Sequence, residues 1–246
     1  MRFLLLQARN AGDPAGPHEA EAFRDELGLA PDQLTPYDLL QGRPPAGLVE
    51  DYDCVLVGGS GEFGVGDASE HPWLREFIDL MGDLGSRGFP TFASCFGFQA
   101  LVVAGGGEVI TDKTRAEVGT FELFTTEHGA ADPLFRAVAP RFGAQLGHKD
   151  HATRLPSDTV HLAGSERSPY QALRVAGKPV YATQFHPELS MTRNRERFLR
   201  YLAAYSTPDM VDSPETVLAR YRETTGATEL LRAFVREVLL PLRRGP

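Results

Sequence analysis

The stretch Thr91-Phe92-Ala93-Ser94-Cys95-Phe96-Gly97-Phe98-Gln99 decides the fold, because a short apolar strand runs directly into a small-x-Cys-x-Gly turn and then into a helical pattern. Such a turn holds its central residue in a strained backbone conformation, and the small neighbours Ala93 and Gly97 let the chain reverse without a clash. The pattern predicts that the Cys95 side chain projects from the carboxyl edge of a sheet, at the N-terminus of a helix.

This position suits Cys95 to be a nucleophile. Unpaired N–H groups and the positive end of the helix dipole favour a thiolate there, and the N–H of Phe96 is a natural oxyanion donor. The competing interpretation is a core cysteine, since free cysteines are among the most buried residues. The strand-turn-helix context favours the nucleophile for Cys95, whereas Cys54 lies inside an apolar strand and is assigned to the core.

The surrounding segments predict an α/β sheet. Short apolar runs that indicate strands occupy residues 1–7, 53–57 and 90–94. Apolar residues recur at helical spacing over 72–84 and 98–103, and strands that alternate with helices are typical of a parallel sheet. Brief alternating runs follow at 120–125, 159–163, 172–175 and 180–183, and they predict an antiparallel addition to the same domain.

The C-terminal part is predicted to be helical. Residues 195–205 are predicted to be helical, and Ser213 before Pro214 and Glu215 marks a capped helix start. Residues 230–239 carry an apolar stripe, which indicates either packing on the core or a docking surface for a partner or a second copy.

Composition narrows the function. The 246 residues are 42% apolar and 24% charged, enough for one compact domain with a sizeable core. The net charge of −8 argues against general affinity for nucleic acid, whose phosphates require a basic surface. Two cysteines, no signal-like N-terminus and no apolar run near 20 residues predict a cytoplasmic protein without a membrane span.

Further motifs carry a family resemblance. Ser94-Cys95-Phe96-Gly97-Phe98-Gln99 and, later in the chain, Gln184-Phe185-His186-Pro187-Glu188 resemble the nucleophile and His-Pro-Glu motifs of class I glutamine amidotransferases, and in particular the glutaminase domain of guanosine monophosphate synthetase. Gly58-Gly59-Ser60 resembles the oxyanion loop of that family, and Gly147-His148-Lys149-Asp150 resembles its segment between nucleophile and histidine. The resemblance covers about residues 50 to 190, and Ala93 and Phe98 depart from the usual Gly and His.

The resemblance implies a flavodoxin-like, mainly parallel sheet with helices on both faces, a small antiparallel elaboration and a C-terminal helical tail. It also implies a catalytic triad in which Cys95 is the nucleophile, His186 the general base and acid, and Glu188 the group that orients the imidazole. Main-chain N–H groups of Gly59 and Phe96 would hold the oxyanion, and Gln99 would contact the γ-glutamyl part of the substrate. No cofactor is implied.

Two other interpretations of these motifs are weaker. His148, Asp150 and His151 have residue types that suit zinc, but no companions lie at finger-like spacing, so we predict no metal. The glycine-dense loop of residues 58–66 resembles a phosphate cradle, yet residues 67–72 delay the following helix. An oxyanion loop or lid is the better account, with a plain connecting loop as the alternative.

The function predicted from these motifs is a glutaminase-type hydrolase that releases ammonia from glutamine through a Cys95 thioester. Residues 1–206 would form the amidotransferase-like domain and residues 207–246 a helical extension. Two alternatives stay open: a stand-alone hydrolase of γ-glutamyl amides or peptides, and a non-catalytic binding or regulatory module. An ammonia-using synthetase would be a separate partner, and a homo-oligomer is also left open.

Overall fold

The computed structural model describes residues 1–244, and its centre is a nine-stranded sheet in the order β2-β1-β3-β4-β11-β10-β9-β6-β7. The strands are β1 (Phe3–Ala8), β2 (Leu34–Asp38), β3 (Cys54–Ser60), β4 (Thr91–Ser94), β6 (Glu117–Thr125), β7 (Arg141–His148), β9 (Thr159–Gly164), β10 (Ala172–Val175) and β11 (Val180–Thr183). A second sheet pairs β5 (Glu108–Thr111) with β8 (Asp150–Arg154).

The strand directions divide the large sheet into two halves. From β2 through β1, β3 and β4 to β11, every neighbouring pair is parallel. From β11 through β10, β9 and β6 to β7, every pair is antiparallel. Thr183 of β11 lies opposite Ser94 of β4, so the segments that follow these two strands leave the sheet side by side. The predicted α/β sheet with an antiparallel elaboration is confirmed, and the elaboration continues the main sheet.

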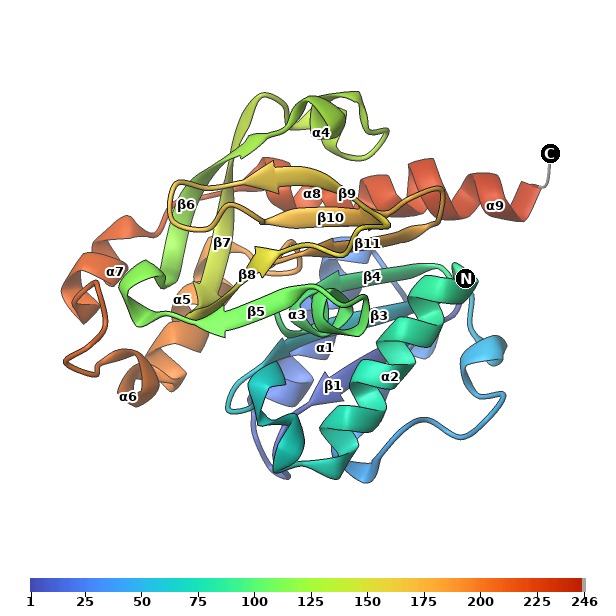
Figure 1. Ribbon diagram of the computed structural model, residues 1–246, viewed down its shortest axis with the longest axis horizontal. Helices are drawn as coiled ribbons and strands as arrows, with labels where there is room; N and C mark the ends of the chain where they lie inside the picture. The colour runs from blue at the N-terminus through green and yellow to red at the C-terminus, as the bar shows by residue number, and fades with distance from the viewer. Residues whose placement is uncertain (245–246) are drawn as a thin grey trace.

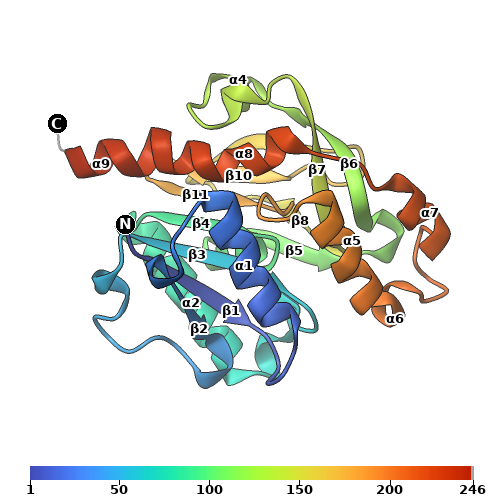
Figure 2. The same ribbon diagram turned by 180° about the vertical axis from the view of Figure 1, so that it is seen from behind.

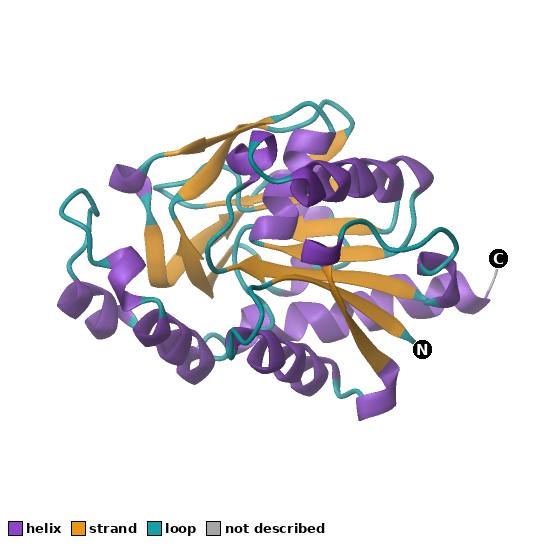
Figure 3. Ribbon diagram, turned by 90° about the horizontal axis from the view of Figure 1, so that it is seen from below, coloured by secondary structure: helices purple, strands orange, loops and turns teal. Residues whose placement is uncertain are grey.

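Helices cover both faces of the sheet, as predicted. The α-helices are α1 (Ala15–Leu27), α2 (Pro72–Arg87), α3 (Phe96–Ala104), α4 (Glu127–Ala131), α5 (Met191–Arg200), α6 (Leu202–Tyr205), α7 (Pro214–Arg220), α8 (Thr225–Phe234) and α9 (Leu240–Arg244). Helices α2 and α3 lie in front of the sheet in Figure 1. Helices α1 and α8 cover the opposite face, which Figure 2 shows. Figure 3 shows the strands between these two groups of helices.

The alternation of side chains along β1 explains why both faces are covered. Phe3 and Leu5 join the core cluster that includes Phe23 of α1 and Phe234 of α8. Leu4 and Leu6 join the opposite cluster with α2 and α3. Successive side chains of a strand point to opposite faces, so an apolar run without alternation needs a hydrophobic partner on each side.

The C-terminal part packs on this core. Ser213 caps α7 as predicted, since its hydroxyl accepts a hydrogen bond from the N–H of Thr216 at 3.3 Å. In the apolar stripe, Leu230, Leu231 and Phe234 are buried, and the ring of Phe234 lies edge-on to Phe92 of β4. The stripe is therefore a packing surface, although the domain boundary at residue 206 stays a prediction. The helical conformation predicted over 195–205 is confirmed, although the structure divides it at Tyr201 into α5, which ends at Arg200, and α6, which begins at Leu202.

The helices of residues 1–244 include none that is long and apolar enough to cross a membrane.

Candidate active site

Cys95 occupies a strained turn between β4 and α3. Its φ of 51° and ψ of −98° make it the one non-glycine residue with a positive φ in the part of the chain that the structure describes. Gly97 has no room for a side chain, because a Cβ there would lie 2.7 Å from Cβ of Val57 and 2.9 Å from Cβ of Ala93. The turn is therefore the predicted elbow. A residue larger than Ala93 would clash with the chain at Gly97.

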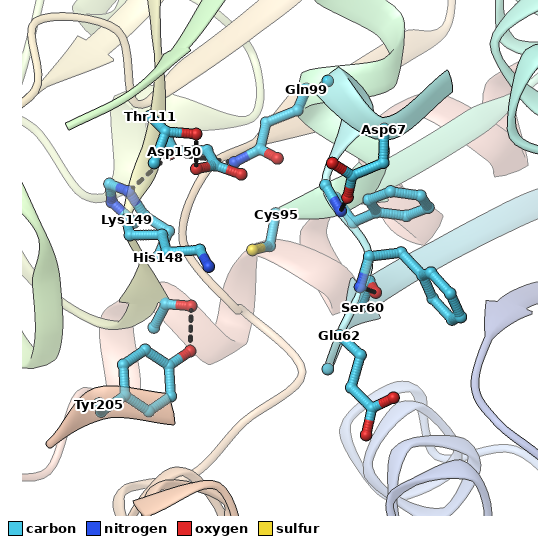
Figure 4. Close-up of a pocket in the computed structure, with 16 residues that line it drawn as sticks. Ser60, Glu62, Asp67, Cys95, Gln99, Thr111, His148, Lys149, Asp150 and Tyr205 are labelled. Atoms are coloured by element: carbon cyan, nitrogen blue, oxygen red, sulfur yellow. Dashed lines mark hydrogen bonds between the residues drawn. The ribbon is translucent and has the colours of Figure 1, made fainter. Parts of the chain in front are cut away.

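A cavity of about 150 Å³ opens in front of Cys95 (Figure 4). The loop after β3 forms one wall with Ser60, Glu62 and Asp67, and Lys149 and Tyr205 lie on the other side of the sulfur. Its full lining is Ser60, Gly61, Glu62, Phe63, Gly64, Gly66, Asp67, Cys95, Phe96, Gln99, Thr111, Gly147, His148, Lys149, Asp150 and Tyr205. The predicted nucleophile thus faces a space that a small substrate can enter.

The burial of Cys95 opposes the thiolate that the sequence predicts at this position. Burial is the main cause that raises the pKa of the thiol to about 12. The charge of Arg197 lowers the pKa, and the carboxylates of Glu188 and Asp150 raise it. Only 6% of the residue is exposed. The helix N-terminus alone does not overcome this desolvation, so the thiol needs a base to give up its proton at neutral pH.

His186 and Glu188 form a buried pair just beyond β11. Nδ1 of His186 lies 2.6 Å from Oε1 of Glu188, and the same carboxylate oxygen accepts a hydrogen bond from the hydroxyl of Ser94 at 3.2 Å. Both side chains are fully buried. Burial lowers the pKa of His186, Glu188 raises it and Arg197 lowers it, and the net shift is downward. The ring is therefore neutral at pH 7, with Nδ1 donating to the carboxylate and Nε2 holding a lone pair.

The two expected oxyanion donors differ. The N–H of Phe96 is at the head of α3, where the first N–H groups of a helix have no partner within the helix. The N–H of Gly59, in contrast, donates to Oε1 of Glu19 at 3.0 Å. It is engaged with a carboxylate in this conformation, so the role predicted for Gly59 requires that bond to break.

The remaining predicted residue, Gln99, lies in the cavity lining with its amide already in use. Its Nε2 donates to the carbonyl of Asp150 at 3.0 Å and to Oε1 of Gln184 at 3.2 Å. These bonds fix the side-chain carbonyl of Gln99, which is the group left for a substrate. Phe98, one of the two departures from the family pattern, is fully buried in the core.

Comparison with known proteins identifies the family. The family model described as glutamine amidotransferase class-I matches residues 43–203, which include Cys95, His186 and Glu188. The chain belongs to the class I glutamine amidotransferases. This confirms the family predicted from the motifs and gives the chain glutamine amidotransferase function, with the hydrolase activity that this class carries.

Two curated relatives set the scale of the similarity. A glutamine-hydrolyzing GMP synthase subunit from Methanothermobacter thermautotrophicus is 32% identical over 163 residues, covering 66% of this chain and 76% of the relative. The GMP synthase of Nitratiruptor sp. is 30% identical over 153 residues, covering 60% of this chain and 30% of the relative. This amidotransferase thus matches less than a third of that longer synthase.

Solved structures share the fold over nearly the whole chain. A glutamine amidotransferase from Thermotoga maritima superposes with a TM-score of 0.76 at 20% identity, covering 98% of this chain and 99% of that one. A glutamine amidotransferase from Methylobacillus flagellatus gives 0.67 at 19% identity, covering 95% and 90%. These likenesses concern the fold alone.

The segment of the amidotransferase that suggested a metal forms hydrogen bonds within the protein. Nδ1 of His148 lies 2.9 Å from the carbonyl of Asp150, and Nε2 lies 3.1 Å from Oε2 of Glu117. Among residues 1–244, no three His, Cys, Asp or Glu side chains come together in a way that suits a metal ion.

Three residues near the site have no role predicted from the sequence. Lys149 brings an ammonium to the cavity, and Tyr205 reaches it from α6 with its hydroxyl donating to the carbonyl of Gly147 at 3.1 Å. Arg197 of α5 places Nη1 3.4 Å from both ring nitrogens of His186. Only the packing of distant segments reveals these positions.

Proposed function

We propose that the chain hydrolyses the γ-carboxamide of glutamine through a thioester on Cys95, with His186 as base and acid and Glu188 orienting the imidazole. One observation carries the proposal. A strained cysteine and a buried His–carboxylate pair emerge side by side from two adjacent parallel strands, next to a cavity. This combination is the arrangement that a cysteine hydrolase needs.

The first half of the reaction forms the thioester. Nε2 of His186 takes the Cys95 proton as the sulfur attacks the amide carbon, and the carbonyl oxygen becomes an oxyanion near the N–H of Phe96. The imidazolium is stabilised by Glu188 and then gives its proton to the departing nitrogen. Ammonia leaves, and the γ-glutamyl group stays bonded to the sulfur.

The second half consumes water. His186, neutral again, takes a proton from a water molecule that attacks the thioester carbon. The C–S bond breaks, the sulfur recovers its proton from the imidazolium, and glutamate is released. The sum is glutamine plus water giving glutamate plus ammonia, with no oxidant or cofactor consumed.

The partner in this proposal is an ammonia-using synthetase on a separate chain. The support is the similarity to the Methanothermobacter relative, whose name makes it one subunit of a GMP synthase. In this arrangement glutamine hydrolysis is slow for the free chain and rises when the synthetase and its substrates bind. A stand-alone γ-glutamyl hydrolase would instead be fully active by itself.

The test is glutamate release from glutamine and from a panel of γ-glutamyl amides and peptides, by the wild-type chain and by Cys95→Ala. Cys54→Ala is the matched control, because Cys54 is also buried but lies within β3. We expect Cys95→Ala to lose at least about 10³-fold in rate and Cys54→Ala to stay near the wild-type rate.

A diazoketone analogue of glutamine extends the test to a chain that turns over slowly when alone. Attack by the sulfur expels N₂ and leaves a thioether, which peptide mass spectrometry locates on one cysteine. Labelling of Cys95 in the wild-type chain, and of neither cysteine in His186→Gln, is the expected result. A chain that releases no glutamate and resists the analogue would instead have the binding role.

A further inference from the structure

Arg197 is a buried guanidinium placed against the proposed base. It lies on α5 with 9% of its surface exposed, and its Nη1 is 3.4 Å from Nδ1 and 3.4 Å from Nε2 of His186. Because Nη1 is equally far from both ring nitrogens, the guanidinium contacts the ring as a whole and is not directed at Nε2 alone.

The backbone of Gly59 makes room for this arrangement. A Cβ on Gly59 would lie 2.5 Å from Nη2 of Arg197 and 2.9 Å from Cε1 of His186. Any side chain there would push the guanidinium and the imidazole away. Gly59, Arg197 and His186 therefore form one packed contact, and the glycine is needed for space on this side as well.

The charge of Arg197 has no carboxylate partner within ion-pair distance. Among the ion pairs of residues 1–244, which include Arg9 with Glu19 at 2.8 Å, none involves Arg197. A buried charge that is not neutralised by contact acts on its neighbours in a medium of low dielectric constant. Nη1 of Arg197 contacts the ring of His186, and the charge of Arg197 also acts on Cys95 and Glu19.

Glu19 of α1 provides the opposing charge in the next layer. Its Oε1 accepts from the N–H of Gly59 at 3.0 Å and from Nη2 of Arg9 at 2.8 Å, and its Oε2 accepts from Nε2 of Gln7 at 2.8 Å. Burial would raise the pKa of Glu19, but the charges of Arg9 and Arg197 and these hydrogen bonds lower it overall. The carboxylate is therefore ionised and fixed.

Three charged groups from three elements act on the pKa of His186. They are Glu188 from its own loop, Arg197 from α5 and Glu19 from α1. Glu188 and Glu19 favour the imidazolium, whereas Arg197 and burial favour the neutral ring.

We propose that Arg197 is a positioning residue for the hydrolysis proposed above: it holds the imidazole of His186 against Glu188 and, as a fixed positive charge, keeps the ring neutral until the thiol proton arrives. The same charge repels the imidazolium that forms next. That repulsion helps to pass the proton on to the departing nitrogen, so one guanidinium serves both the base and the acid role of His186. This inference rests on the proposed function only for its catalytic consequence.

Three variants test the proposal. Arg197→Met removes the charge and keeps an unbranched apolar stem, Arg197→Lys keeps the charge without the planar fork, and Glu19→Gln removes the opposing charge with little change in shape. Removing the positive charge stabilises the imidazolium, so the pKa of His186 rises and the acidic limb of kcat/KM moves to higher pH. Removing the negative charge moves the same limb to lower pH.

The expected size is roughly a tenfold loss of kcat/KM on the acidic side for Arg197→Met, because a one-unit displacement of the limb is a factor of ten. Arg197→Lys returns the limb toward the wild-type position. A purely structural role for Arg197 would lower kcat or thermal stability and leave the limb in place. An unmoved limb in a folded Arg197→Met protein, or a Glu19→Gln shift in the same direction as Arg197→Met, overturns the proposal.

Direct titration of His186 keeps this test separate from the proposed function. The protein is labelled with ¹³C at the histidine Cε1 positions, and the signal missing from His186→Asn assigns the residue. Wild type, Arg197→Met and Glu19→Gln are then titrated by NMR without substrate. If no γ-glutamyl compound is hydrolysed, the proposed function fails, but opposite shifts of the His186 signal in the two variants still establish the charge effect.

Discussion

Two buried histidine–glutamate pairs stand close to the cavity, and their surroundings differ. In the first, Nδ1 of His186 donates to Oε1 of Glu188 at 2.6 Å, and Nη1 of Arg197 lies 3.4 Å from Nε2. In the second, His148 has both ring nitrogens occupied, one by the Asp150 carbonyl at 2.9 Å and one by Glu117 at 3.1 Å. Both ring nitrogens of His148 are thus engaged within the protein.

The carboxylates differ in the same way. Oε2 of Glu117 lies next to His148 and also accepts a hydrogen bond from Nε2 of Gln171 at 2.6 Å. The His148–Glu117 pair is therefore part of a wider polar network between strands. Glu188 is tied to the elbow instead, through the hydroxyl of Ser94. Burial and pairing alone therefore do not distinguish a proton-transfer group from a structural one. In the proposed function, the two pairs differ instead at Nε2 of His186, which has only the Arg197 guanidinium near it, and in the position of His186 just after β11.

The largest expected effect comes from replacing the two histidines in turn. His186→Gln removes the lone pair that takes the thiol proton in the proposed mechanism, so we expect glutamine hydrolysis to fall by about 10²–10⁴-fold. His148→Gln keeps a hydrogen-bonding side chain in the wall of the cavity, so the rate should stay within about tenfold of wild type. Steady-state glutamate release measures both. The comparison breaks if His148→Gln is the more damaging change while the protein remains folded.

The position of the resting proton gives a smaller and more specific effect. Because the pKa of Cys95 is about 12, the thiolate fraction rises roughly tenfold for each pH unit through the neutral range. Alkylation by iodoacetamide should therefore keep accelerating up to at least about pH 9, with Cys54→Ala used so that only Cys95 reacts. A plateau near neutral pH would mean a resting thiolate–imidazolium pair, in which Nε2 of His186 is already protonated.

The elements that carry motifs could be predicted from the sequence because their signals are local. The elbow needs small residues at fixed positions around Cys95, and the His-Pro-Glu triplet follows a short apolar strand. The strands predicted over 172–175 and 180–183 have the same bounds in the structure.

Other elements escaped prediction for physical reasons. Strand β2 is an edge strand in which only Leu34 is buried, and it contains Pro36, so it shows little apolar alternation. Helix α1 has Gly16 and Pro17 among its first residues and has a weak apolar face. In β7, Gly143 and Gly147 interrupt the alternating pattern that a strand normally shows.

The residues around His186 were missed because no local pattern distinguishes them. Arg197 lies on a helix that also carries Arg193, Arg195 and Arg200, and such a run is typical of a solvated face. Its contact with Gly59, and through Gly59 with Glu19, joins segments that are far apart in the chain. Only the packing of α1 and α5 beside the end of β3 brings them together.

The smallest expected effect is a loss of stability that distinguishes Glu117 from Glu188. In Glu117→Gln the amide oxygen can take the place of Oε2, but it is a weaker acceptor than a carboxylate for His148 and Gln171. The new NH2 group lies buried where Oε1 has no partner, so we expect the free energy of unfolding to fall by about 1–3 kcal/mol. Urea unfolding followed by the fluorescence of Trp73, the single tryptophan, measures this loss. Hydrolysis by the folded variant should remain near wild type.

Glu188→Gln is the matched control, because it is the same substitution at the other buried pair. Here the amide turns the hydrogen bond to Nδ1 of His186 into one that no longer stabilises an imidazolium, so activity should fall far more than stability does. If Glu117→Gln instead loses hydrolysis by orders of magnitude at unchanged stability, the second pair takes part in the chemistry. The surroundings of Nε2 of His186 would then no longer be what separates the two pairs.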